Sequence, residues 1–199
     1  MRTLLPLLLL VGCGDDGGSS LPADAADIDA PGGGADGAID APPGATLAIT
    51  STAYANGGAI PPAQACVSKG GMNKSPPLTF ANPPAGTLSY AVVLTDLTNS
   101  LVHSAIYDIP LAAAGLPGDV DVGYQPADVP MAHQTANYSG TRAYAGPCPP
   151  NAHMYQLKVY ALSTATVTGA TMATTKEQLV TLLATNLGTA TLTGTFTPP

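Results

Sequence analysis

Two histidines, a tyrosine and an aspartate stand where the sequence predicts strand ends, and together they could bind a small anion. His153 and Tyr155 are two residues apart at the start of an apolar run. On a strand, residues with this spacing point to the same face. Because a protonated imidazole and a phenol hydroxyl both donate hydrogen bonds to a negative oxygen, the pair forms one half of a candidate binding site.

The segment just before His153 is rich in proline. In Gly146-Pro147-Cys148-Pro149-Pro150, the prolines fix the backbone dihedral φ and remove N–H donors. We expect a stiff loop that forms one wall of a pocket, with Cys148, Pro149 and Pro150 beside the ligand.

Two further strands supply the other half of the site. Residues 90–96 form an apolar run that ends in Asp96, and residues 103–110 begin with His103 and close with Pro110. A nearby carboxylate favours the protonated form of a histidine. We therefore assign Asp96 the role of keeping an imidazole charged and oriented.

These motifs, in this order, resemble the phosphatidylethanolamine-binding protein family, in its bacterial Raf kinase inhibitor-like branch. That family has an Asp-Pro-Asp turn followed by His-Trp and Ile-Pro, and later Gly-Pro-x-Pro-Pro followed by His-Arg-Tyr. The sequence departs from these motifs at Leu97-Thr98, Ser104 and Met154. Further landmarks between Ile49 and Phe196 are Gly58-Ala59-Ile60-Pro61, Ser75-Pro76-Pro77-Leu78, and Asn137-Tyr138 with Gly140.

The resemblance implies a non-catalytic binding protein whose pocket surrounds a phosphate, a phospholipid headgroup or a similar anion, without a cofactor or metal. Because family members are also known as kinase-pathway and protease inhibitors, the alternative is a protein-interaction module that uses the pocket rim. The ligand-binding residues carried over are Asp96, His103, Cys148, Pro149, Pro150, His153 and Tyr155.

Composition independently predicts a mainly β domain. Short runs rich in Val, Tyr, Thr and Ile, separated by Gly and Pro, are typical of an antiparallel β-sandwich. We expect one C-terminal helix, with Thr174 and Glu177 as its capping box and Gly188 at its end, and short peripheral helical turns. The clearest strands are expected at 47–52, 90–96, 103–109, 153–162 and 189–196.

An enzyme or a metal site is less well supported. A hydrolase could use Ser104 or Ser75 with His103 and Asp96, but alternation puts Ser104 on the opposite strand face from His103. No Gly-x-Ser-x-Gly motif is present. A zinc site could use His103, His153 and Asp96, but no paired-ligand spacing supports it. His133 is expected to face solvent.

The first 44 residues predict export and membrane anchoring. Residues 1–12 have a basic start and a short apolar run, typical of a signal peptide. Leu10-Val11-Gly12-Cys13 resembles a bacterial lipobox, which implies lipidation of Cys13 and an inner- or outer-membrane location in the cell envelope. An ordinary secreted protein with an incidental Cys13 is the alternative. Residues 13–44 predict a disordered acidic tether, and 45–199 the folded domain.

Charge and cysteine content add two constraints. The chain has a net charge of −7. From residue 45 onward there are six acidic and five basic residues, so most of the negative charge lies in the predicted tether. No basic cluster indicates nucleic-acid binding. If Cys13 carries lipid, Cys66 and Cys148 are left to form a disulfide in an oxidising compartment, or to remain two buried thiols.

Overall fold

The structure is a computed structural model that describes residues 46–199. The predicted signal peptide, the Cys13 lipidation site and the predicted tether lie outside the described residues. Within 46–199, no helix combines the length and apolar character needed to cross a membrane.

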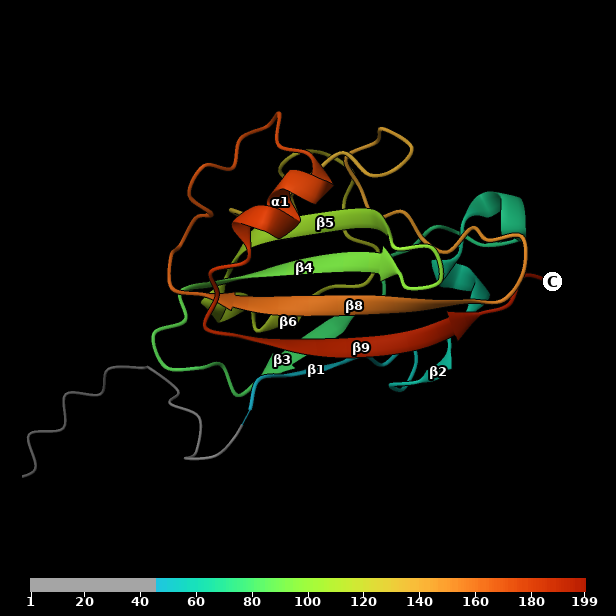
Figure 1. Ribbon diagram of the computed structural model, residues 1–199, viewed down its shortest axis with the longest axis horizontal. Helices are drawn as coiled ribbons and strands as arrows, with labels where there is room; N and C mark the ends of the chain where they lie inside the picture. The colour runs from blue at the N-terminus through green and yellow to red at the C-terminus, as the bar shows by residue number, and fades with distance from the viewer. Residues whose placement is uncertain (1–45) are drawn as a thin grey trace, which may run out of the picture. The chain divides into compact units, whose positions relative to one another are not determined.

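A six-stranded sheet forms the centre of the domain (Figure 1). Its four long strands are β4 (Ser89–Asp96), β5 (Leu101–Pro110), β8 (His153–Leu162) and β9 (Gly188–Phe196). The short strands β2 (Gly58–Ala59) and β7 (His133–Gln134) lie at its edges, in the order β2-β9-β8-β4-β5-β7. All pairings are antiparallel except β2 with β9, which is parallel.

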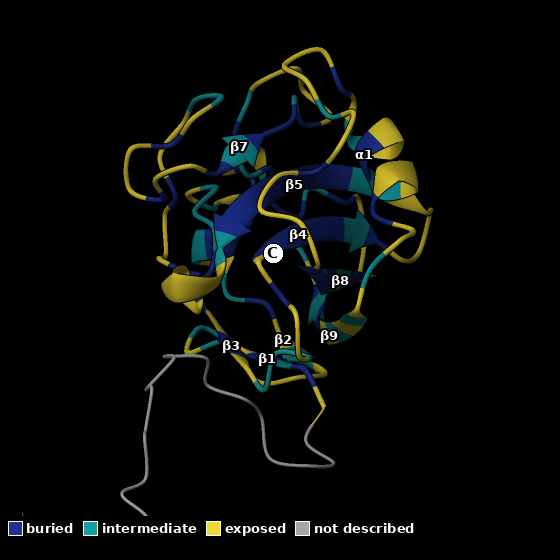
Figure 2. Ribbon diagram, turned by 90° about the vertical axis from the view of Figure 1, so that its left-hand side faces the viewer, coloured by how far each residue is buried: buried dark blue, intermediate teal, exposed yellow. Residues whose placement is uncertain are grey.

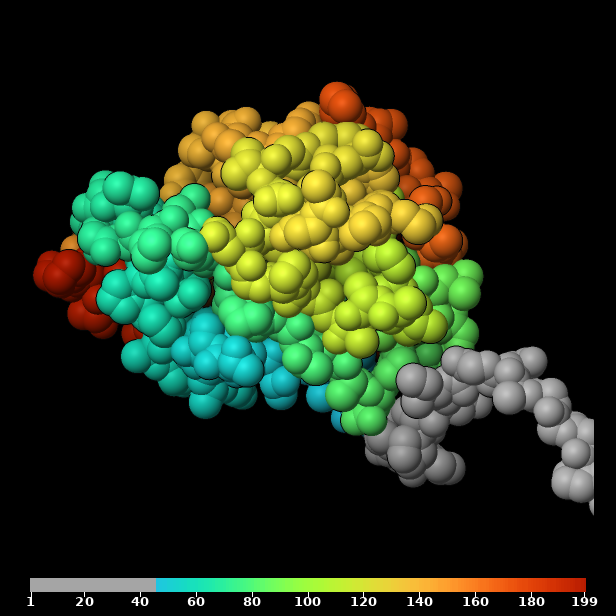
Figure 3. All heavy atoms as spheres, turned by 180° about the vertical axis from the view of Figure 1, so that it is seen from behind, coloured from blue at the N-terminus to red at the C-terminus, as the bar shows by residue number. Residues whose placement is uncertain are grey.

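A three-stranded sheet packs against one face of this sheet. It contains β1 (Ala48–Thr50), β3 (Leu78–Ala81) and β6 (Gly115–Leu116), with β3 in the middle. The main core lies between the sheets and includes Phe80, whose ring contacts Tyr90 with centroids 4.9 Å apart. The long segment between β5 and β8 covers much of the rear of the molecule (Figure 3).

The other face of the large sheet is covered by the helix α1 (Lys176–Leu182), which lies over β4 and β5 (Figure 1). Leu179 and Leu183 pack there against Val93 and Tyr107 in a second core cluster. Strand β4 is therefore buried on both faces, as its dark blue colour shows (Figure 2). This explains its continuous apolar sequence, because neither face meets solvent.

The fold class agrees with the sequence prediction, but the helix differs in detail. Its N-cap is Thr175, whose side chain accepts from the N–H of Gln178 while the Gln178 side chain accepts from the N–H of Thr175. The predicted box of Thr174 and Glu177 was wrong by one residue, because the Thr174 hydroxyl instead accepts from the N–H of Thr171. The helix ends before Leu183, and Gly188 begins β9.

The expected peripheral turns are three short 3-10 helices. They are η1 (Pro62–Gln64), η2 (Val67–Lys69) and η3 (Leu111–Ala113). The first two lie in the segment that supports the proline-rich loop.

Candidate functional site

The ends of β4 and β8 bring two site residues opposite each other. Asp96 pairs with Tyr155 in the sheet register, and cross-strand partners share a face. His153 lies two residues before Tyr155, and the two rings are tilted by only 28° with centroids 6.4 Å apart. Asp96, His153 and Tyr155 therefore meet at one end of the large sheet.

A β-bulge brings His103 to the same face. Thr95 pairs with Val102 and Leu94 pairs with Ser104, which leaves His103 as an extra residue on β5. A bulge of this kind interrupts the alternation of side chains and can redirect one of them. The His103 ring accordingly meets Tyr155 edge to face, with centroids 5.4 Å apart.

Asp96 is a buried carboxylate that holds His153 in place. Its Oδ2 atom lies 2.6 Å from Nδ1 of His153, and its Oδ1 accepts from the N–H of Thr98. Burial raises the pKa of Asp96, but the hydrogen bonds and the charge of the His153 ring outweigh burial, so the pKa lies below its ordinary value. Asp96 is therefore ionised at neutral pH.

His103 is held by the backbone instead. Its Nδ1 lies 3.0 Å from the carbonyl oxygen of Ala145, and its ring also packs edge to face on Tyr138. Burial lowers the pKa of His103, although the Ala145 carbonyl and the Asp96 charge act in the opposite direction.

The Tyr155 hydroxyl is buried and has no hydrogen-bond partner within the described part of the chain. The Asp96 carboxylate and the Cys148 backbone lie close enough to affect its pKa, but neither has the distance and angle of a hydrogen bond to it. Burial raises the pKa of Tyr155 far above its ordinary value, and the negative charge of Asp96 adds to this effect. The hydroxyl therefore keeps its proton and remains available as a donor.

The proline-rich loop forms the wall opposite these side chains, and it is tied to the segment that contains η1 and η2. Cys148 is joined to Cys66 by a disulfide, with Cα atoms 5.3 Å apart. The N–H of Cys66 donates to the carbonyl of Pro147. The Asn73 side chain donates to the carbonyl of Tyr144 and accepts from the N–H of Gly146.

Together these groups line a cavity of about 130 Å³. All seven ligand-binding residues carried over from the family resemblance line it. Sequence reasoning missed three others: Asn99 and Leu101, for which the sequence contained no signal, and Tyr138, which it noted only as a landmark. The lining residues are Asp96, Asn99, Leu101, His103, Tyr138, Cys148, Pro149, Pro150, His153 and Tyr155.

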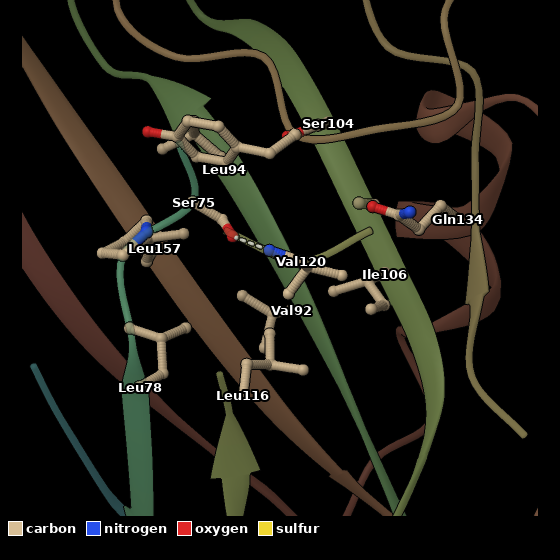
Figure 4. A pocket seen from close by; sticks show the side chains of 13 residues that line it. Ser75, Leu78, Val92, Leu94, Ser104, Ile106, Leu116, Val120, Gln134 and Leu157 are labelled. Atoms are coloured by element: carbon tan, nitrogen blue, oxygen red, sulfur yellow. Dashed lines mark hydrogen bonds between the residues drawn. The ribbon is translucent and has the colours of Figure 1, made fainter. Parts of the chain in front are cut away.

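The prediction that Ser104 faces away from His103 was wrong. Because of the bulge, Ser104 pairs with Leu94 and lies on the core face, where it lines a separate apolar cavity of about 30 Å³ (Figure 4). Ser75 lies in the same cavity, and its hydroxyl accepts from the N–H of Val120. Within residues 46–199, neither serine hydrogen-bonds to a histidine, so the described part of the chain does not assemble a serine–histidine pair.

The prediction that His133 faces solvent was also wrong. Its Nδ1 donates to the buried carboxylate of Asp108 at 3.0 Å, and its ring packs against Tyr107 and Tyr124. The pairing of β7 with β5 places His133 directly opposite Tyr107, a long-range contact that local sequence does not reveal. A search of the described residues for three or more metal-binding side chains in one place finds none.

The chain belongs to the phosphatidylethanolamine-binding protein family. The family's sequence model matches residues 50–197, which is the β-sandwich with its terminal pocket. This membership agrees with the resemblance noted from the motifs.

Relatives are found in several organisms. A UPF0098 protein of Methanothermobacter thermautotrophicus is 35% identical over 121 residues, covering 58% of this chain and 76% of that protein. A Mycobacterium tuberculosis protein named as lipoprotein LppC is 31% identical over 167 residues, covering 80% and 76%.

Solved structures share the fold. YbcL of Escherichia coli, described as a member of the mammalian PEBP family, superposes with a TM-score of 0.69 at 29% identity, covering 77% of this chain and 99% of that chain. The homologue CT736 of Chlamydia trachomatis gives a TM-score of 0.62 at 26% identity, covering 75% and 96%.

Proposed function

We propose that this protein is a lipid-anchored, non-catalytic binding protein whose pocket accepts a small oxyanion such as phosphate or a phosphate-bearing headgroup. The observation that carries the proposal is the buried Tyr155 hydroxyl without a partner. Leaving a buried polar group unpaired costs about 1–3 kcal/mol, so a ligand that accepts from it recovers this free energy.

The surroundings of that hydroxyl support the same class of ligand. His103 and His153 line the cavity with it, and either imidazole donates a charge-assisted hydrogen bond once it is protonated. The cavity volume of about 130 Å³ suits a small group such as phosphate or carboxylate rather than a large cofactor.

The membrane anchor is proposed from two observations. The lipobox-like segment ending at Cys13 follows an apolar run typical of an export signal. The relative LppC carries the name of a lipoprotein over a match that covers 80% of this chain. We place the protein in the cell envelope on this basis.

Replacement of Tyr155 by phenylalanine tests the pocket directly. Binding of inorganic phosphate or phosphoethanolamine to the full-length protein would be measured by calorimetry and ³¹P NMR at about pH 6, where imidazole is largely protonated. Losing one hydrogen bond to a charged ligand should weaken binding about tenfold or more. Because the lost hydroxyl has no partner in the protein, the free energy of unfolding should stay the same or rise.

Tyr107→Phe is the matched control. The Tyr107 hydroxyl contacts Tyr124 and lies in the second core cluster, outside the pocket lining. This variant should bind the anion as tightly as the wild type. Equal affinity in Tyr155→Phe and wild type would contradict the proposed role of the hydroxyl.

The alternative function, a protein-interaction module, is favoured by one feature of the pocket rim. Four large apolar side chains there remain exposed. They are Leu97 (41%), Leu101 (39%), Tyr138 (38%) and Met154 (49%). Leu97 and Met154 are also joined by a backbone hydrogen bond, so they form one continuous edge.

Two variants distinguish anion binding from protein binding experimentally. A protein partner captured from the native envelope should be lost with Met154→Glu and retained with His153→Gln. The anion function predicts the reverse pattern for phosphate binding. Retention of a protein partner by both variants would argue against the pocket rim as the protein-binding surface.

A further inference from the structure

Each pocket histidine is held in a single tautomer by its partner. Nδ1 of His153 faces the Asp96 carboxylate, and Nδ1 of His103 faces the Ala145 carbonyl. Carboxylate and carbonyl oxygens only accept hydrogen bonds. Both Nδ1 atoms therefore carry a hydrogen, whatever the charge of the ring.

It follows that each neutral ring presents a lone pair on Nε2. Neither Nε2 atom meets hydrogen-bond geometry with another residue in the described part of the chain, although the Gly146 backbone lies beside the His103 ring. Both rings line the cavity. The third histidine differs, because Nε2 of His133 accepts from the side-chain amide of Gln125 at 3.1 Å. The two pocket histidines thus retain a free nitrogen for a ligand.

Apart from the tyrosine hydroxyls and the Asn99 amide, the pocket lining has no group that favours a bare anion. Asp96 on β4 contributes a negative charge, and Tyr155 on β8 and Tyr138 contribute neutral hydroxyls. The loop 147–150 contributes no charged side chain, and no lysine or arginine is among the lining residues. With both imidazoles neutral, the hydroxyl donors would be opposed by two lone pairs and a carboxylate, which repel an oxyanion.

We infer that the pocket takes up one proton with each oxyanion it binds, and that this proton lies between Nε2 of His153 and a ligand oxygen. This inference rests on the proposed function, because it specifies how the same pocket receives its anion. The proton comes from solvent or from an acidic hydroxyl of the ligand, and no covalent bond between heavy atoms changes.

His153 is the carrier because of its partner. Its Nδ1–H lies 2.6 Å from the Asp96 carboxylate, whose negative charge balances a positive ring. His103 has a neutral carbonyl in that position and is almost completely buried, which lowers its pKa. His153 is therefore the ring that takes up the proton, and His103 is not.

The need for this proton restricts the class of ligand. Inorganic phosphate keeps one hydroxyl proton even at about pH 8, so it can itself supply the hydrogen bond to Nε2, whereas a phosphate monoester loses its last proton near about pH 6 and then depends on protonation of the protein. Sulfate remains fully ionised in this range and depends entirely on protonation of the protein. The pocket should prefer inorganic phosphate over sulfate, and this preference should increase above neutral pH.

Calorimetry with sulfate and inorganic phosphate on the full-length protein tests this inference. Titrations at pH 6, 7 and 8 in buffers of different ionisation enthalpy give the number of protons taken up. With sulfate, we expect net proton uptake on binding and an affinity that falls as the pH rises from 6 to 8. Phosphate should bind more tightly than sulfate at pH 8.

Two variants test whether His153 carries the proton that is taken up. His153→Gln should abolish the proton uptake that accompanies sulfate binding. His133 lies outside the pocket, so His133→Gln should retain this uptake. If His153→Gln fails to fold, the wild-type sulfate titrations decide alone. Anion binding without proton uptake, at an affinity that is the same at pH 6 and 8, would overturn the inference and leave the proposed function intact. Absence of binding by either anion at every pH would overturn both.

Discussion

At the scale of single residues, Asp96 organises the pocket. It is buried at the end of β4 and uses its two oxygens on the His153 ring and the Thr98 backbone. Its charge also acts on Tyr155 and His103. One carboxylate therefore influences all three donor side chains, although we assign it no direct ligand contact.

Asp96 should contribute to stability in a pH-dependent manner. Its pKa is lower in the folded protein than in the unfolded chain, so ionised Asp96 stabilises the fold above the unfolded value of about 3.9. This contribution is lost as the pH falls through the folded pKa. Urea titrations should show Asp96→Asn less stable by about 1–3 kcal/mol from pH 5 to 7, with the difference shrinking below about pH 4.

The exposed Asp121 provides the control for this experiment, because its carboxylate makes no hydrogen bond within the described residues. Asp121→Asn should change the free energy of unfolding by no more than about 0.5 kcal/mol at any of these pH values. A difference between wild type and Asp96→Asn that persists unchanged to pH 2 would contradict the account of Asp96.

At the scale of elements, the site depends on one irregular strand and one irregular loop. The bulge in β5 turns His103 toward Tyr155, where a regular strand would turn it away. The proline-rich loop takes its position from the Cys66–Cys148 disulfide and from Asn73. The bulge interrupts the regular pairing of β5 with β4, the loop lies outside the sheets, and both shape the cavity.

Removing the disulfide should lower stability and loosen the pocket wall. The bond joins residues separated by 82 positions, for which chain entropy predicts a contribution of about 4 kcal/mol. In urea titrations, the Cys66→Ala/Cys148→Ala double variant should lose about 2–4 kcal/mol, and calorimetry should show weaker phosphate binding. Reducing agent should destabilise the wild type and leave the double variant unchanged. Equal stability of variant and oxidised wild type would show that the bond does not support the fold.

At the scale of the whole molecule, the pocket and the start of the described chain lie at opposite ends. The Thr46 carbonyl accepts from the Asn82 side chain, in the loop that leads to the first residue of β4. The pocket lies at Asp96, the last residue of that strand, and a strand of eight residues spans roughly 25 Å. Figure 1 shows this separation, with the first coloured residues and the tip of β4 on opposite sides.

The anchor itself is tested at Cys13. In cells given labelled palmitate, the wild-type protein should incorporate the label and sediment with membranes, because several acyl chains give stable anchoring. Cys13→Ser should do neither, and its folded domain should unfold at the wild-type urea concentration. Incorporation of label into Cys13→Ser would contradict the lipobox interpretation.

Much of the fold could be predicted from the sequence because it depends on local patterns. The long strands β4, β5, β8 and β9 appear as apolar runs, since a strand buried on one or both faces must be apolar there. The short strands β2, β3, β6 and β7 were not among the clearest predictions. With two to four residues each, they exist through pairing with distant partners.

The amino-acid sequence by itself determined the class of fold, the long strands and the motif residues from which the family is recognised. Only the tertiary structure decided where Ser104 and His133 point, which nitrogen of each pocket histidine is free, and that Tyr155 is buried without a partner. The physical reason is that apolar periodicity is a local property of the chain. A bulge, a tautomer or an unpaired hydroxyl depends instead on which distant groups the folded sheets bring within hydrogen-bond distance.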